Sequence, residues 1–203
     1  MVVVLLPKAE GGFRPIGLIP NPPRIWMRVR RIEAKAWEIS CDRKYLYAGA
    51  GRGATVAAWK QAARAEVAAA GGKQYGQTLL DLVKAFERIP HRVLLREARR
   101  LGYPIRMIRL AIATYRLPRV IRVGAAYSDL VWALRGIVAG SGLATSEMRI
   151  VMINIVDNAL LMHPTVEPTL FVDDLSGEQD GVEDVIVSEL GGFPRISLQR
   201  PAR

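Results

Sequence analysis

Phe171-Val172-Asp173-Asp174 is the stretch from which the rest of the chain can be interpreted: an aromatic residue, an aliphatic residue and two adjacent carboxylates. It follows an apolar run that ends at Leu170 and is typical of the end of a strand. Two neighbouring acids there are costly, because each carboxylate loses hydration and repels the other. A divalent cation would offset that cost, so the stretch indicates a metal site.

The composition is that of a basic globular protein. The chain has 203 residues, 50% of them hydrophobic, which is enough for one domain or two small ones. Its formal net charge of +10 favours a polyanionic partner such as nucleic acid, the alternative being an ordinary basic surface. Cys41 is the single cysteine, which fits a reducing intracellular compartment, nucleus or cytoplasm. The apolar start ends at Pro7, too early for a signal peptide or membrane span.

Hydrophobic periodicity predicts short strands alternating with helices. The first two strands would form a hairpin around Gly11-Gly12. The expected strands are 2–6, 13–18, 78–82, 120–123, 129–132 and 169–172. The expected helices are 24–40, 56–70, 90–101, 105–115, a long one after the loop 135–142, and 182–190.

Apolar residues at helical spacing indicate which helix faces are buried. In helix 24–40 we expect Trp26, Val29 and Ile32 on one side, and we expect the tryptophans in the core rather than as base-stacking platforms. Glu147 is one of several polar residues that interrupt the apolar stripe of the long helix, so this helix is not a membrane span. The stripe itself consists of Met148, Val151, Met152, Ile155, Ala159 and Met162.

Asp81 is a further candidate ligand, near the end of the predicted strand 78–82. If this strand and the one before Asp173 are neighbours in one sheet, their carboxylates converge, and such a cluster suits magnesium. Two ions roughly 3.5 to 4 Å apart could activate a 3′-hydroxyl and stabilise a leaving pyrophosphate. For any single aspartate at a strand end, a turn or helix-cap role is the commoner alternative.

Four segments of the chain form one pattern: Pro7-Lys8 with 11–18, 80–87 with His91, 135–142 and 171–174. In this order they resemble the fingers motif, the first catalytic motif, the template and nucleotide loop and the aromatic-x-Asp-Asp signature of the reverse transcriptases, most closely those of non-long-terminal-repeat retrotransposons. The resemblance spans about residues 7 to 176.

The resemblance implies an α+β fold, that of a right-hand polymerase in which an antiparallel palm sheet packs on helices. Residues 1–75 would be the fingers-like region, 76–190 the palm-like region with the catalytic carboxylates, and 191–203 a disordered basic tail. Little sequence follows the acid pair for the family's later palm strands, so we expect the thumb to be absent and synthesis to be weakly processive.

Roles follow from the resemblance by position. Asp81 and Asp173 would be catalytic metal ligands and Asp174 the third carboxylate, holding two Mg²⁺ ions, with Mn²⁺ as a substitute. The remaining site residues would bind the nucleotide: Lys8 and Arg14 at the triphosphate, Phe86 against a ribose 2′-hydroxyl, and Gly140 where the backbone approaches the nucleotide.

Departures from the family pattern leave alternatives open. Ala139 stands where many relatives have glutamine, and Glu87 where many have aspartate. The leading hypothesis is an RNA-directed DNA polymerase whose partners are an RNA template, a DNA or RNA primer and deoxynucleoside triphosphates, without a membrane. One alternative is an inactive, truncated retroelement fragment that binds nucleic acid through its basic surface. The other is a different palm-fold enzyme, such as a nucleotide cyclase.

Overall fold

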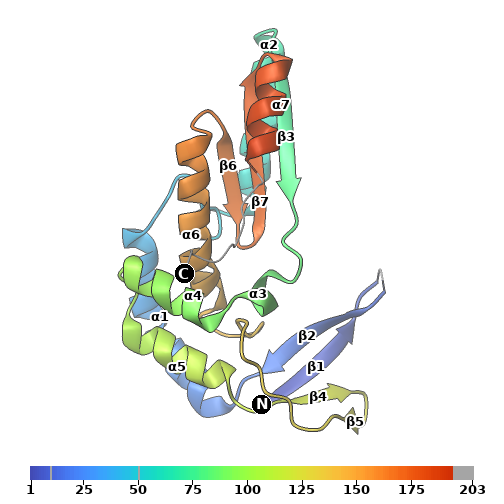
Figure 1. Ribbon diagram of the computed structural model, residues 1–203, viewed down its shortest axis with the longest axis vertical. Helices are drawn as coiled ribbons and strands as arrows, with labels where there is room; N and C mark the ends of the chain where they lie inside the picture. Colours follow the sequence, from blue (N-terminus) through green and yellow to red (C-terminus); the bar gives the residue numbers. More distant parts are fainter. Residues whose placement is uncertain (10, 50, 194–203) are drawn as a thin grey trace, which may run out of the picture. The chain divides into compact units, whose positions relative to one another are not determined.

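The structure is a computed structural model that describes residues 1–9, 11–49 and 51–193 (Figure 1). The described chain is a mixed α+β fold with two separate sheets packed on helices. It forms two compact units, each made of two chain segments. Unit 1 consists of Met1–Cys41 and Lys84–Val151, and unit 2 of Asp42–Val83 and the residues from Met152 onward. The helices of the described residues include none with the length and apolar character needed to span a membrane.

The sheet of unit 1 begins with the predicted hairpin. β1 (Val2–Pro7) pairs antiparallel with β2 (Phe13–Leu18), and β4 (Val120–Val123) pairs parallel with β1. The partner of β4 is β5 (Ala126–Tyr127), so the prediction of a strand at 129–132 was wrong. Gly124, with φ 58, permits a tight turn directly after β4, and the chain pairs back at once.

The helices of unit 1 are α1 (Asn21–Ser40), α3 (Ala85–Arg88), α4 (His91–Arg100), α5 (Ile105–Tyr115) and the first part of α6 (Ala144–Met162). All of them except the short α3 were predicted from the sequence, but α1 buries the other side from the one expected.

The buried residues of α1 are Met27, Ala34 and Trp37, whereas Val29 and Ile32 are exposed. Trp37 explains this choice, because its indole Nε1–H donates to the Leu101 carbonyl at 2.8 Å, an acceptor that a buried indole requires. The other tryptophans depart from the expectation of core positions, since Trp59 and Trp132 are exposed and Trp26 is half-buried.

Unit 2 contains α2 (Ala54–Ala70), β3 (Gln74–Leu80), the second part of α6, β6 (Glu167–Phe171), β7 (Asp174–Gly181) and α7 (Glu183–Gly192). Its sheet is antiparallel in the order β3-β7-β6, so the strands leading to Asp81 and to the acid pair belong to one sheet, although they are not neighbours, because β7 lies between them. On the outer side of β6, the Leu170 N–H donates to the Tyr45 carbonyl at 2.8 Å, and the Leu170 carbonyl accepts from Tyr47 at 2.9 Å. The segment around Leu46 therefore covers that sheet edge.

Helices α2 and α7 pack on opposite faces of this sheet (Figure 1). Alternate residues of a strand point to opposite sides, so each helix contacts a different set of strand residues. The α2 contact is polar: Gln61 Nε2 donates to Ser176 Oγ at 2.7 Å, and Arg64 Nη1 donates to the buried Glu178 Oε2 at 2.9 Å. The α7 contact is apolar, with Ile186 of the helix lying close over Gly76 of β3.

The C-terminal end of the described chain is more regular than expected. Gly191 and Gly192 belong to α7, and the next residue, Phe193, is buried against Gly177 of β7. The rest of the predicted tail, 194–203, lies outside the described residues.

A first prediction concerns the contact between α7 and the sheet. A Cβ at Gly76 would lie 2.3 Å from Ile186 Cγ2 and 3.0 Å from Leu190 Cδ1. We expect Gly76→Val to lower the free energy of unfolding by about 1–3 kcal/mol, measured by urea denaturation.

The matched control is Gly191→Ala, because a Cβ at Gly191 meets no atom within 4 Å. This variant should unfold at the wild-type urea concentration or slightly above it. If Gly76→Val were as stable as the control, the α7 contact described above would be wrong.

Candidate functional site

The three acids singled out in the sequence lie at one end of the unit 2 sheet. Leu80, the last residue of β3, pairs with Leu175 of β7. Asp81 therefore follows at the end of the sheet where β7 begins with Asp174. Asp173 lies in the two-residue turn that joins β6 to β7 at the same edge. Because neighbouring strands are about 4.8 Å apart, the pairing brings Asp81 close to the adjacent acids Asp173 and Asp174, which are distant from it in sequence. We call Asp81, Asp173 and Asp174 the carboxylate edge.

The turn of the carboxylate edge is strained. Phe171 pairs with Asp174, which leaves Val172 and Asp173 as the turn residues. Val172 has φ 62, a left-handed conformation that a β-branched residue rarely adopts. Such strain costs on the order of 1–3 kcal/mol and is concentrated at functional sites in proteins.

The carboxylate edge has the oxygen atoms that a hard cation prefers, but its side chains are not arranged around a common point. Carboxylate oxygens are the ligands that magnesium prefers. Yet the residues that the structure describes include no group of three His, Cys, Asp or Glu side chains placed to hold a metal ion. Asp81 and Asp174 are exposed and Asp173 is half-buried. Ligation by all three would therefore require rotation of side chains, for which the exposure of Asp81 and Asp174 leaves room.

In unit 1, the loop of residues 135–142, which we call the glycine loop, is joined by its backbone to the segment after Asp81. Gly136 N–H donates to the Ile89 carbonyl, and Ile137 N–H donates to the Phe86 carbonyl, both at 2.7 Å. Gly136 has φ 94, and a Cβ there would lie 2.8 Å from the Glu87 carbonyl oxygen. Only glycine fits this close approach.

The other end of the glycine loop is joined to β2. Gly17 N–H donates to the Ala139 carbonyl at 3.0 Å. Gly140 has φ 103, and a Cβ there would lie 2.9 Å from the Gly17 carbonyl oxygen. Parts of three of the four segments noted in the sequence thus meet within unit 1, although the role of Gly140 toward a nucleotide stays a prediction.

The remaining predicted nucleotide-binding residues also lie in unit 1. Phe86 is half-buried in α3. Lys8 lies in the β1–β2 turn, and Arg14 lies on β2 opposite Leu6. Lys8 and Arg14 are exposed, and neither side chain has a hydrogen-bond or ion partner within the described parts of the chain. Both cations are therefore available to an anion, and their predicted roles remain untested.

His91 fixes the start of the glycine loop and is not a metal-ligand candidate. Its ring is buried, Nε2 donates to the Gly136 carbonyl at 2.9 Å, and Nδ1 accepts from Arg116 Nε at 3.3 Å. Burial, with the nearby Arg116 and Arg119 charges, lowers the pKa of His91 despite its bond to Gly136. The neutral imidazole therefore acts as a structural link.

A buried carboxyl group behind the glycine loop was not identified as a site residue in the sequence analysis. Tyr115 Oη lies 2.5 Å from Glu147 Oε2, to which it donates, and 2.7 Å from Ser141 Oγ. Glu147 is fully buried, and its other oxygen, Oε1, has no hydrogen-bond partner within the described residues. The chain Ser141–Tyr115–Glu147 thus connects the glycine loop to the first turn of α6.

The electrostatics of this chain follow from its burial. Burial raises the pKa of Glu147 to about 7, although the Tyr115 hydroxyl bond acts in the opposite direction. Burial and the Glu147 carboxylate raise the pKa of Tyr115 well above its ordinary value. The signal in the sequence is Glu147 itself, one of several polar residues among the apolar ones of the long helix, where it counts only as evidence against a membrane span.

Comparison with known proteins finds solved structures of similar fold but no matching family. No protein-family model and no curated protein matches the sequence. Among solved structures, a telomerase from Candida albicans in complex with a fragment of telomeric RNA matches with a TM-score of 0.66 and 12% identity, over 95% of this chain and 38% of that one. An apo telomerase from Candida tropicalis, truncated from its C-terminal domain, matches with a TM-score of 0.60 and 14% identity, over 94% of this chain and 45% of that one.

The chain shares its fold with part of each of these two telomerases. It resembles part of telomerase over most of its length, and it spans less than half of either telomerase chain. At these identities the likeness concerns the arrangement of helices and strands and does not assign an activity.

A second prediction concerns the strained turn of the carboxylate edge. Replacing Val172 by Gly removes the steric strain of φ 62 from the folded state. Glycine loses more backbone entropy on folding than valine, but this cost is smaller than the strain. We expect Val172→Gly to raise the free energy of unfolding by about 1 kcal/mol, measured by urea denaturation. A loss of stability would show that the turn is not strained.

A third prediction concerns pH. The pKa of Glu147 is about 7 in the folded chain against an ordinary 4.5, so the folded state binds more protons than the unfolded state between these values. Stability should therefore fall as pH rises from about 4.5 to 7, by about 3 kcal/mol from this residue. Glu147→Gln keeps the shape and cannot ionise, so it should be close to wild type at pH 4.5 and clearly more stable at pH 8.

The difference between wild type and Glu147→Gln isolates this effect from that of His91, whose lowered pKa makes stability fall in the opposite direction, as pH drops below its ordinary value. Unfolding curves at pH 4.5, 6, 7 and 8 provide the measurement. A constant difference across this range would mean that Glu147 is not buried as described.

Proposed function

We propose that this chain is the fingers-and-palm part of a reverse transcriptase of retrotransposon type, which adds deoxynucleotides to a primer on an RNA template. The observation that carries the proposal is the pairing of β3 with β7, which puts Asp81 at the sheet edge where Asp173 and Asp174 lie. Two further observations support it. The fold resembles part of telomerase, and four segments resemble reverse-transcriptase motifs in the same order.

In this proposal the carboxylate edge holds the catalytic metal. Asp81 and Asp173 would be the direct ligands of magnesium and Asp174 the third carboxylate. The ions, when bound, would activate the primer hydroxyl and stabilise the leaving pyrophosphate. The side chains of Asp81, Asp173 and Asp174 do not form a three-ligand group in the structure, so ion binding would have to turn them toward the metal.

The residues of unit 1 would select and orient the nucleotide. Lys8 and Arg14 are exposed cations suited to triphosphate oxygens, Arg14 by paired hydrogen bonds. Phe86 would exclude the ribose 2′-hydroxyl, and its carbonyl is already held by Ile137 of the glycine loop. Gly140 would let the backbone approach the nucleotide.

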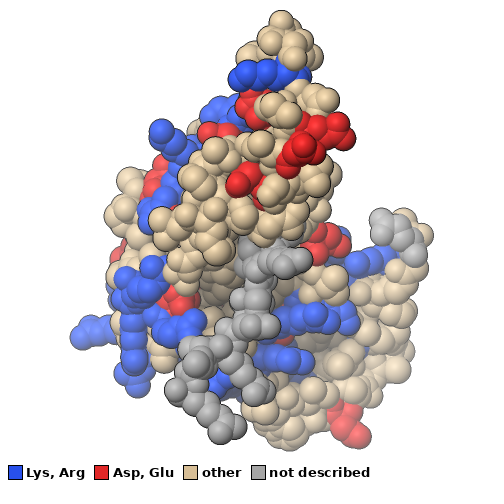
Figure 2. Space-filling model, turned by 45° about the horizontal axis from the view of Figure 1, so that its top comes forward, with Lys and Arg blue, Asp and Glu red and all other residues tan. Residues whose placement is uncertain are grey.

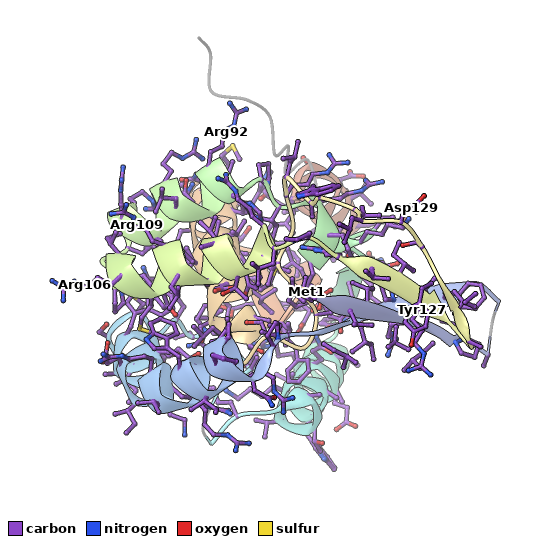
Figure 3. All side chains as sticks on the ribbon, turned by 90° about the horizontal axis from the view of Figure 1, so that it is seen from below. Met1, Arg92, Arg106, Arg109, Tyr127 and Asp129 are labelled. Atoms are coloured by element: carbon purple, nitrogen blue, oxygen red, sulfur yellow. The ribbon has the colours of Figure 1, made fainter. Side chains whose placement is uncertain are left out.

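Nucleic acid as the partner is supported by the surface charge. Helices α4 and α5 carry six exposed arginines and a single acid, Glu97, which is buried and bound by Arg96 Nε at 2.7 Å and Arg100 Nε at 2.8 Å. Arg92 and Arg106 project outward from these helices (Figure 3). Lys and Arg side chains also gather on part of the face in Figure 2. Such a surface binds phosphates with strong salt dependence.

A second candidate function is favoured by one observation, the missing convergence of the acidic side chains. The chain would then be an inactive retroelement fragment that binds nucleic acid through its arginines. It would bind RNA in a salt-sensitive manner and would extend no primer.

The fourth prediction is the deciding experiment. Purified chain is incubated with a labelled primer on an RNA template, deoxynucleotides and Mg²⁺ or Mn²⁺, next to the variants Asp81→Asn and Asp173→Asn. We expect short extension by the wild type and a loss of at least about 100-fold in both variants, because each removes a ligand charge.

Asp184→Asn is the matched control, since this exposed acid of α7 loses the same charge away from the carboxylate edge. It should extend primers like the wild type. Equal extension by wild type and Asp173→Asn would end the catalytic assignment. RNA binding without extension by any form would establish the inactive fragment instead.

A further inference from the structure

Helix α1 presents an apolar stripe to solvent. Its members are Ile25, Val29, Ile32, Ala36 and Ile39, separated by steps of four, three, four and three residues. Exposed fractions are 64% for Ile25, 65% for Val29, 79% for Ile32 and 78% for Ile39, and Ala36 is exposed as well. We call these five residues the α1 seam. It lies opposite the side of α1 that buries Met27, Ala34 and Trp37 in unit 1.

The spacing of the seam identifies the kind of surface that would cover it. Alternating steps of four and three are the a and d positions of a heptad, the pattern by which one helix packs along another. At 100° per residue the seam occupies an arc of about 80°, narrower than the apolar face of a helix that lies on a domain core. Its length is roughly 21 Å, which corresponds to about four turns of a partner helix.

A row of cations runs beside the seam. Arg24, Arg28, Arg31 and Lys35 are exposed, and none of the four has an ion partner within the described residues. The exposed acid on the other side, Glu33, is already paired with Arg30. A covering helix must therefore bring its own negative charges to this row, because interhelical pairs beside the a/d seam determine partner choice.

This charge pattern argues against a second copy of the chain. An antiparallel pair of α1 helices would place Arg28 and Lys35 beside the same residues of the other copy. A parallel pair would offer Glu33, which is already held by Arg30. The formal charge of +10 adds repulsion between copies.

We propose that the α1 seam is a docking site for an amphipathic α-helix of a partner protein, one with apolar a and d positions and an acidic row beside them. Burial of the seam would remove four branched side chains from water, and the acidic row would pair with Arg24, Arg28, Arg31 and Lys35. The site is independent of the proposed polymerase activity, since it uses neither the carboxylate edge nor the glycine loop.

Two synthetic 21-residue helical peptides test the proposal with the full chain. Both have Leu at a and d; the acidic peptide has Glu at e and g, and the basic peptide has Lys there. Fluorescence anisotropy of the labelled peptides gives the dissociation constants. We expect the acidic peptide to bind at least 10-fold more tightly than the basic one, and the double variant Val29→Glu/Ile32→Glu to weaken its binding at least 10-fold.

Charge reversal provides a second, independent variant. Arg28→Glu/Lys35→Glu leaves the seam intact and should reverse the preference, so that the basic peptide binds more tightly than the acidic one. Leu161→Glu is the control, because this leucine of α6 is 81% exposed and lies outside the seam. The control should bind the acidic peptide like the wild type.

Three results would overturn the proposal. The first is equal binding of the acidic peptide to the wild type and to Val29→Glu/Ile32→Glu. The second is self-association of the wild type in sedimentation that the same double variant abolishes, which would make the seam a contact between copies. The third is a loss of binding to single-stranded RNA or to anionic vesicles in the double variant with peptide binding unchanged, which would give the seam a different ligand.

Discussion

The antiparallel pairing of β3 with β7 is the constraint on which the candidate catalytic site depends. It joins a strand from the middle of the sequence to the strand after the acid pair, and its last pair, Leu80 with Leu175, puts Asp81 beside the β6–β7 turn. The α7 contact over Gly76 and the ion pair between Arg64 and Glu178 hold opposite faces of this sheet. The contacts that stabilise the unit 2 sheet therefore also hold the proposed metal ligands in position.

In unit 1 the corresponding constraint is the close backbone packing of the glycine loop. Gly136 and Gly140 have positive φ and approach carbonyl groups of α3 and β2 so closely that no side chain would fit. Behind them, Tyr115 connects Ser141 to the buried Glu147, whose pKa burial raises to about 7. Three side chains thus link the glycine loop to a buried carboxyl group.

Much of this arrangement could be predicted from the sequence because it depends on local signals. The β1–β2 hairpin, α5 and the strand before the acid pair follow from periodicity and turn residues. The buried side of α1 could not be predicted, because both sides are apolar and only the tertiary acceptor for the Trp37 indole distinguishes them. The role of Glu147 was equally hidden, since its partner Tyr115 is 32 residues away. The sequence predicted converging carboxylates, but the described side chains form no three-ligand group, because strand pairing fixes backbone positions and leaves side-chain directions open.

We propose that Asp81, Asp173 and Asp174 form one cation site at the edge of the unit 2 sheet. Titration with Mn²⁺ followed by electron paramagnetic resonance measures this without any need for polymerisation. We expect the wild type and Asp180→Asn, which is altered at the far end of β7, to bind Mn²⁺, and we expect Asp81→Asn and Asp173→Asn each to lose this binding. Unchanged Mn²⁺ binding in both of the latter variants, or no binding by the wild type, would contradict it.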